Sequence, residues 1–159
     1  MTPEYILIHH SATRDTASSS WEAIHRYHTV TNGWHDIGYH YGIERIGEHF
    51  QLRFGRPTTE PGAHCSEGGF NRKSIGICLV GDFDKEAPPE PQLQMAFVLC
   101  RSLMRKHNIP PHNVLGHREA GLHAGFDWRK GQFKSCPGLL FDMDAFRSNL
   151  LANRLPPVV

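Results

Sequence analysis

The stretch Ser74-Ile75-Gly76-Ile77-Cys78-Leu79-Val80-Gly81 is the clearest central strand in the sequence, and it decides the fold class. Short apolar runs bounded by turn residues are typical of strands buried inside a sheet. Residues 5–9 (Tyr-Ile-Leu-Ile-His) predict a second buried strand, and residues 39–44 and 50–54 predict a hairpin. A further short strand is expected at residues 113–116.

Helices are predicted between and after these strands. Residues 92–107 predict the strongest helix, because apolar residues recur there at three- and four-residue spacing. Ser19 with Glu22 predicts a capping box for a helix of about ten residues that ends at Asn32-Gly33. Asp142 predicts the N-cap of a last helix.

Two long stretches, residues 55–73 and 120–138, are predicted to be irregular. Loops of that length in a compact domain are more often functional than idle. The order of the elements predicts an α/β fold, with a central mixed β-sheet and helices packed on it. A length of 159 residues suits one domain, residues 1–159.

The composition gives no reason to expect nucleic acid or an anionic membrane as a partner. The sequence has 17 Lys+Arg against 16 Asp+Glu, a formal net charge of +1. Its start, Met1-Thr2-Pro3-Glu4-Tyr5, does not resemble a secretory signal, and no apolar run approaches membrane-spanning length. We therefore expect the protein to be synthesised in the cytoplasm, where thiols stay reduced, and not to insert into a membrane.

Possible metal ligands occur at three places near strand ends: His9 or His10, His117, and Cys136. Only a folded sheet could bring such separated residues together. Side chains alternate along a strand, so His9 and His10 face opposite sides and only one is expected to bind metal. Each residue also has an ordinary structural interpretation, as a hydrogen-bonded histidine or a small buried cysteine.

Five segments, in this order, resemble the N-acetylmuramoyl-L-alanine amidase family that includes phage T7 lysozyme and the peptidoglycan-recognition proteins. They span residues 8–137 and are Ile8-His9-His10-Ser11-Ala12-Thr13, Gly38-Tyr39-His40-Tyr41, Gly62-Ala63-His64, Asn71-Arg72-Lys73-Ser74-Ile75-Gly76-Ile77-Cys78-Leu79-Val80-Gly81, and Gly116-His117-Arg118-Glu119 joined to Lys134-Ser135-Cys136-Pro137. Each segment is a weak signal alone, and together they are a strong one. The resemblance implies the single-domain fold of that family.

The resemblance implies a zinc ion, Zn²⁺, bound by His9, His117 and Cys136. Related cytosolic amidases have aspartate at the third position, so Cys136 places the chain nearer the phage and recognition-protein branch. The implied reaction is hydrolysis of the amide bond between N-acetylmuramic acid and L-alanine in peptidoglycan. Three protein ligands leave the fourth position of a tetrahedral zinc for water, which is the layout of a catalytic site.

The resemblance also implies roles for residues around the metal. Tyr39 would orient the attacking water, and Lys134 would stabilise the oxyanion. His64 resembles a family residue near the substrate groove. Asn71 and Arg72 follow it and are predicted to bind the stem peptide, since arginine suits carboxylates.

The identity of the general base and the function of the chain each have alternatives. Glu119 is an alternative base, although orienting a ligand or capping a loop suits it better. Three rival functions remain: a non-catalytic peptidoglycan-binding recognition protein, a cysteine hydrolase using Cys136 with His117, and a regulator that binds another protein such as an RNA polymerase. The favoured interpretation is an endolysin-like monomer that reaches the cell wall after release from the cytoplasm.

Overall fold

A computed structural model describes residues 1–14 and 20–155. Its centre is a five-stranded sheet with the order β3-β2-β4-β1-β5. The strands are β1 (Tyr5–His10), β2 (Tyr41–Ile46), β3 (His49–Phe54), β4 (Ser74–Leu79) and β5 (Val114–Gly116). All neighbouring pairs are parallel except β2 with β3, which form an antiparallel hairpin. The prediction of a mixed sheet is confirmed.

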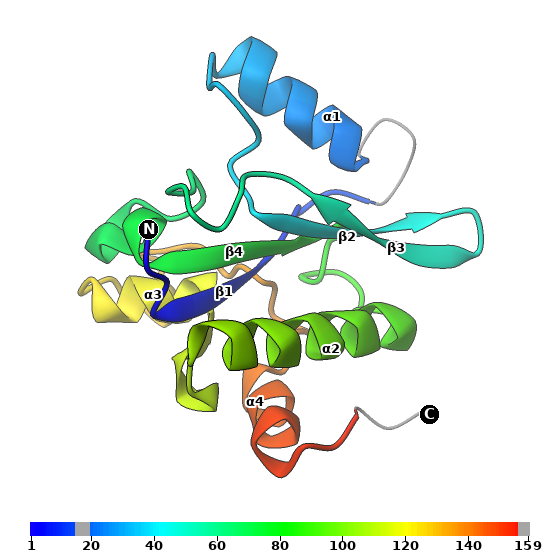
Figure 1. The fold of residues 1–159 in the computed structure, drawn as a ribbon, viewed down its shortest axis with the longest axis vertical. Coiled ribbons are helices and arrows are strands. Elements are labelled where there is room, and N and C mark those ends of the chain that lie inside the picture. Colours follow the sequence, from blue (N-terminus) through cyan, green and yellow to red (C-terminus); the bar gives the residue numbers. More distant parts are fainter. Residues whose placement is uncertain (15–19, 156–159) are drawn as a thin grey trace.

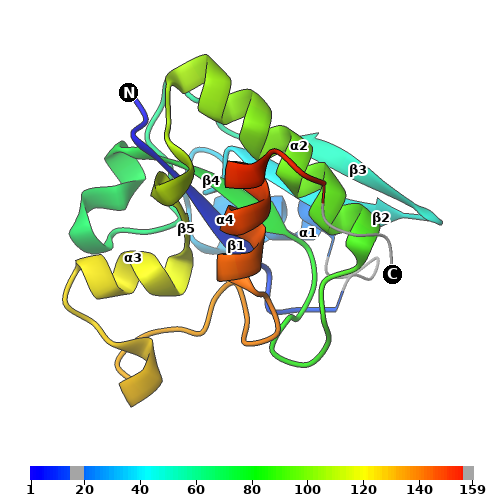
Figure 2. The ribbon, with the colours of Figure 1, turned by 90° about the horizontal axis from the view of Figure 1, so that it is seen from below.

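Helices cover both faces of this sheet (Figure 1). They are α1 (Trp21–Arg26), which continues as the π-helix η1 (Tyr27–Thr31), α2 (Glu90–His107), α3 (His117–His123) and α4 (Met143–Ala152). Helix α1 lies on one side of the sheet, and α2 and α4 lie on the other. Figure 2 shows α2 and α4 lying across the sheet. Three short 3₁₀ turns, η2 (Glu67–Arg72), η3 (Pro111–Asn113) and η4 (Trp128–Lys130), complete the described chain. None of the helices in residues 1–14 and 20–155 has both the length and the apolar content to cross a bilayer.

Alternation along β1 divides its side chains between two cores. Ile6 and Ile8 belong to the large core shared with α2 and α4, whereas Leu7 packs in the smaller core on the other face. His9 follows the direction of Leu7, so it faces away from α2 and α4. The two faces expected for His9 and His10 are therefore confirmed.

The structure shifts or replaces some predicted elements. Ser19 lies outside the described residues; Ser20 caps α1, its hydroxyl accepting from the amide of Ala23 at 3.3 Å. Helix α3 differs from the prediction that residues 120–138 are irregular, because it extends from His117 to His123. It is only seven residues long and contains Gly121, so it carries little periodic signal. The last helix begins as predicted, with Asp142 accepting from Ala145 at 2.8 Å.

Gly42 allows Trp21 of α1 to lie directly on β2. A Cβ atom at residue 42 would lie 2.2 Å from the Trp21 ring. We expect Gly42→Ala to lower the free energy of unfolding by about 1–3 kcal/mol through overpacking, measured by urea denaturation. Trp21→Leu should relieve the clash, so the double variant should lose less than the sum of the single losses. Additive losses would contradict this explanation.

Two histidines act as hydrogen-bond acceptors for the backbone. Nδ1 of His40 accepts from the amide of Gly76 at 2.9 Å, and Nδ1 of His28 accepts from the amide of Gly38 at 3.1 Å. An Nδ1 atom can accept only when it carries no proton. Burial is the main cause that lowers the pKa of both rings, and Arg56 contributes in each case. Both histidines are therefore neutral parts of the folded structure.

Because these two histidines are neutral in the folded chain, we expect the free energy of unfolding to fall in acid. Their pKa lies below the ordinary 6.5 in the folded chain only, so the unfolded chain binds more protons once the pH falls below about 6.5. The free energy of unfolding should be highest above that pH and fall between pH 7 and 5, by at most about 1.4 kcal/mol per pH unit for each histidine. Denaturant titrations across this range measure the slope. His40→Gln should flatten it, and an unchanged slope in that variant would contradict the assignment.

Candidate metal centre

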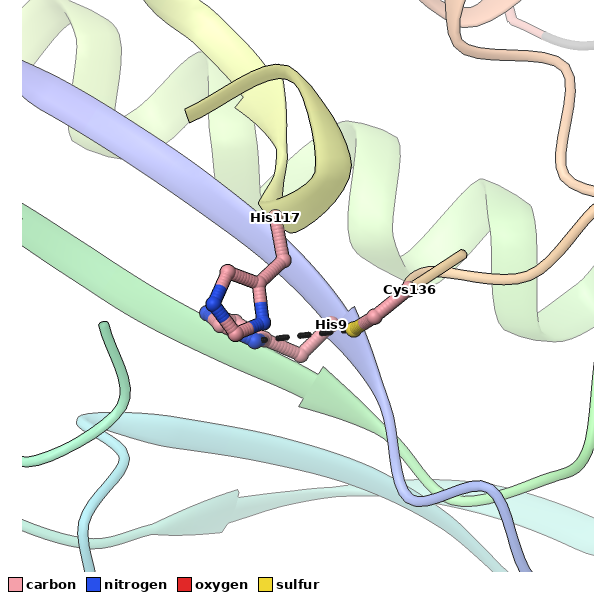
Figure 3. A group of neighbouring side chains, drawn as sticks. All are labelled: His9, His117 and Cys136. Atoms are coloured by element: carbon pink, nitrogen blue, oxygen red, sulfur yellow. Dashed lines mark hydrogen bonds between the residues drawn. The ribbon is translucent and has the colours of Figure 1, made fainter. Parts of the chain in front are cut away.

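Three side chains from distant parts of the sequence converge at the carboxyl end of the sheet (Figure 3). The possible ligand atoms of His9, His117 and Cys136 all lie within 4.8 Å of one another, and all three residues are buried. Nδ1 of His9 lies 3.7 Å from Sγ of Cys136, and the rings of His9 and His117 are 4.5 Å apart. Two imidazoles and one thiol are a donor set that suits zinc.

The fold explains why these residues meet. His9 is near the end of β1, and His117 directly follows β5, which pairs with β1 in parallel. The carboxyl ends of parallel strands lie at the same edge of a sheet, where ligands commonly bind. Cys136 reaches this edge through a loop held by the amide of Arg118, which donates to the carbonyl of Cys136 at 2.6 Å.

Burial keeps all three groups in their neutral forms. It is the largest cause that lowers the pKa of His9 well below its usual value and that of His117 to about 4. Nearby Lys134 lowers both further, whereas Glu67 acts in the opposite direction on His117. Burial also raises the pKa of Cys136 to about 12. Neutral imidazoles are ready to bind a metal, and a bound metal would displace the thiol proton.

His64 lies behind His9. Nδ1 of His64 is 3.0 Å from Nε2 of His9, so the ring nitrogen of His9 turned away from Cys136 has a hydrogen-bond partner. Such a bond fixes the tautomer and the orientation of a metal-binding histidine. His64 also borders the pocket in front of the cluster, but the residue is buried, with 8% of its surface exposed. The geometry therefore supports a role for His64 in orienting His9 more directly than a role in binding substrate.

Arg118 organises the loop that carries Cys136. Its guanidinium donates to the carbonyls of Ser135, Gly138 and Phe141, and it stacks over Trp128 at 5.0 Å. Arg118 belongs to the Gly-His-Arg-Glu segment, but no pattern in the sequence indicates this role. One buried cation therefore fixes the backbone on both sides of the sulfur.

Tyr39 and Lys134 line a pocket of about 370 Å³ in front of the three groups. The ring of Tyr39 lies 5.2 Å from that of His9, and Lys134 is exposed. Burial, followed by Cys78 and Cys136, raises the pKa of Tyr39 well above its usual value. Tyr39 is therefore a neutral phenol that can donate a hydrogen bond. Tyr39 and His28 also line a second hollow, of about 360 Å³.

Asn71, Arg72 and Glu119 lie outside the lining of this pocket. The side-chain oxygen of Asn71 accepts from the amides of His64 and Cys65, at 2.8 and 2.7 Å, so it holds the loop. Arg72 is exposed. Glu119 accepts from the amide of Gly116 and pairs with Arg147, and these bonds favour its capping role over that of a base.

Comparison with known proteins gives the family. A mixed sheet with a buried His-His-Cys cluster at the carboxyl ends of its parallel strands defines an α/β protein with a candidate metal centre. The family model for N-acetylmuramoyl-L-alanine amidases matches residues 1–139. The chain belongs to the N-acetylmuramoyl-L-alanine amidase family, as its sequence motifs predict.

Individual relatives agree with this assignment. Peptidoglycan-recognition protein LB of Drosophila melanogaster is 33% identical over an alignment of 123 residues, which covers 72% of this chain and 50% of that protein. The endolysin of Klebsiella phage KP32 is 38% identical over 85 residues, 54% of this chain and 52% of the endolysin. The chain thus spans about half the length of the curated relatives it matches. The solved N-acetylmuramoyl-L-alanine amidase LysC from Clostridium intestinale URNW superposes with a TM-score of 0.75 at 26% identity, covering 95% of this chain and 87% of LysC.

Proposed function

We propose that this chain is a zinc-dependent amidase that hydrolyses the bond between N-acetylmuramic acid and L-alanine in peptidoglycan. The observation that carries the proposal is the convergence of His9, His117 and Cys136 in the wall of a pocket that Tyr39 and Lys134 also line. The family assignment and an endolysin relative support the reaction class. The proposed role is endolysin-like lysis of the cell wall by one monomeric domain, after release from the cytoplasm.

The donor set fits a zinc ion better than it fits a nucleophilic cysteine. A catalytic cysteine needs a lowered pKa, whereas burial raises the pKa of Cys136 to about 12. A cysteine hydrolase would also leave His9 without a role, although its Nδ1 lies 3.7 Å from the sulfur. When bound by these three residues, zinc supplies Lewis acidity that polarises an amide carbonyl and activates a water molecule.

The residues around the metal position supply hydrogen bonds and charge. Tyr39 is a neutral phenol, so it can donate a hydrogen bond to the attacking water or to the developing oxyanion. Lys134 brings a cation to the mouth of the same pocket and would stabilise negative charge there. His64 holds His9 through the 3.0 Å contact between their rings. The two hollows that Tyr39 and His28 both line offer room for a glycopeptide.

Product analysis tests the reaction. Purified protein with one equivalent of zinc should release new N-terminal alanine from peptidoglycan and no new reducing sugar ends. A strong chelator should abolish this release, and added zinc should restore it. Release of reducing ends would contradict the bond assignment, and activity that resists the chelator would favour the cysteine hydrolase.

A non-catalytic recognition protein is the second candidate, because a recognition protein is among the relatives. It would bind peptidoglycan and release no alanine. The same product assay, run beside a sedimentation assay with insoluble peptidoglycan, separates the two functions. Binding without hydrolysis by the zinc-loaded chain would favour the receptor.

Tyr39→Phe tests the hydrogen bond proposed for the phenol. The variant keeps the ring against His9 and removes only the hydroxyl. We expect kcat to fall about 10²–10³-fold, as for the loss of one oxyanion donor, with zinc affinity nearly unchanged. Steady-state kinetics on a soluble muropeptide measure this change. Tyr41→Phe is the matched control, since Tyr41 packs against the large core, and it should keep kcat. An unchanged kcat in Tyr39→Phe would remove Tyr39 from the reaction.

A further inference from the structure

His117 has a buried ring nitrogen for which none of the residues in the proposed mechanism is a hydrogen-bond partner. Nε2 of His117 is buried, and no hydrogen-bond partner for it lies in the described part of the chain. In Figure 3 the other ring nitrogen, Nδ1, is on the side of the Cys136 sulfur. When Nδ1 of a neutral imidazole binds a metal, Nε2 carries the proton. His117 in its proposed role would then bury an N–H group that needs an acceptor.

Glu67 lies beside this ring. The possible ligand atoms of Cys65, Glu67 and His117 all lie within 4.8 Å of one another. The carboxylate of Glu67 is an acceptor, whereas the thiol of Cys65 is a weak donor whose sulfur lies 3.6 Å from Oε2 of Glu67. Glu67 is only partly buried, so its side chain has room to turn. A short rotation would bring the carboxylate to His117.

The loop that carries Glu67 is held in place from both sides. Asn71 accepts from the amides of His64 and Cys65, and Phe70 is buried against Tyr5. Gly68 and Gly69 follow Glu67 with φ of +60° and +71°, a left-handed bend that favours glycine. This sharp, anchored turn keeps Glu67 next to the candidate metal centre.

We propose that Glu67 is a positioning residue for His117: its carboxylate accepts the hydrogen bond that Nε2 donates when the other ring nitrogen holds the metal. The proposal rests on the zinc site of the proposed function. A carboxylate behind a metal-binding histidine fixes the tautomer of the ring and raises its basicity. His9 has its partner in His64, and His117 would have its partner in Glu67.

Zinc affinity tests this role apart from catalysis. In competition with a chromophoric chelator, Glu67→Ala should bind zinc about 10- to 100-fold more weakly than the wild type. Glu67→Gln keeps an acceptor oxygen and should lose less. The absorption bands of the cobalt-substituted protein should shift in Glu67→Ala, because His117 is no longer fixed. Glu48→Ala, at an exposed turn, is the matched control and should match the wild type in both readouts.

Each other outcome overturns the proposal in a distinguishable way. Unchanged zinc affinity and cobalt spectrum in Glu67→Ala would overturn it and leave the proposed function intact. A wild type that binds no zinc would overturn both. Two zinc ions per wild-type chain, falling to one in Cys65→Ala, would make Cys65 and Glu67 ligands of a second metal instead. A matching loss of stability in the metal-free Glu67→Ala chain would show that the residue only supports the loop.

Discussion

Cys136→Ala should abolish zinc binding and hydrolysis together. The change removes one of three donors, and the remaining histidines, His9 and His117, are a poor set for a tetrahedral ion. Loss of an outer partner costs about 10- to 100-fold in metal affinity, so loss of a ligand should exceed about 100-fold. Metal analysis after dialysis should find about one zinc per wild-type chain and almost none in the variant.

Cys100→Ala is the matched control for this experiment. Cys100 is also fully buried, but it lies on α2 in the large core, on the face of the sheet opposite His9. This control should keep its zinc and its activity while losing some stability. If Cys136→Ala also retains stoichiometric zinc, the thiol is not a ligand and the proposed centre is wrong.

Arg118→Ala should cause the largest loss of stability among the residues around the site. The side chain donates to three carbonyls, including that of Phe141 at 2.8 Å, and its removal leaves these acceptors buried without their donor. Each buried acceptor left without a donor costs about 1–3 kcal/mol, so the free energy of unfolding should fall by several kcal/mol. Urea denaturation of the metal-free chain measures the loss. Because the loop also carries Cys136, zinc affinity should fall as well.

Arg129→Ala separates this effect from a general loss of charge. Arg129 pairs with Asp127 on the surface, at 2.9 Å, and exposed pairs contribute little. This variant should unfold at nearly the same denaturant concentration as the wild type. Equal stability of Arg118→Ala and the wild type would show that the loop does not depend on the guanidinium.

The sheet could be predicted because its strands are short, apolar and bounded by turn residues. The run at 74–81 gave β4, and the alternation of Leu7, Ile8 and His9 gave the two faces of β1. Helix α3 could not be found in this way. It begins at a metal-ligand candidate and is capped from within by Glu119, whose carboxylate accepts from the amide of Gly116.

The candidate site was predictable mainly through the resemblance of its motifs to a known family. Histidine and cysteine next to strand ends indicated a possible metal site but left His9 and His10 as alternatives, and only the resemblance to the amidase family implied the set His9, His117 and Cys136. Polar residues in loops have many roles. Asn71 was predicted to bind substrate, yet its side-chain oxygen accepts two backbone amides, which only the folded loop reveals.

The spacing of the three converging residues also affects how the protein is made. In the order of translation, Cys136 follows its partner His9 by 127 positions. A ribosome must therefore add the whole segment between these two residues before the centre can assemble, and a product truncated between His117 and Cys136 holds two of the three groups. The proposed amidase would thus stay inert until translation has passed Cys136.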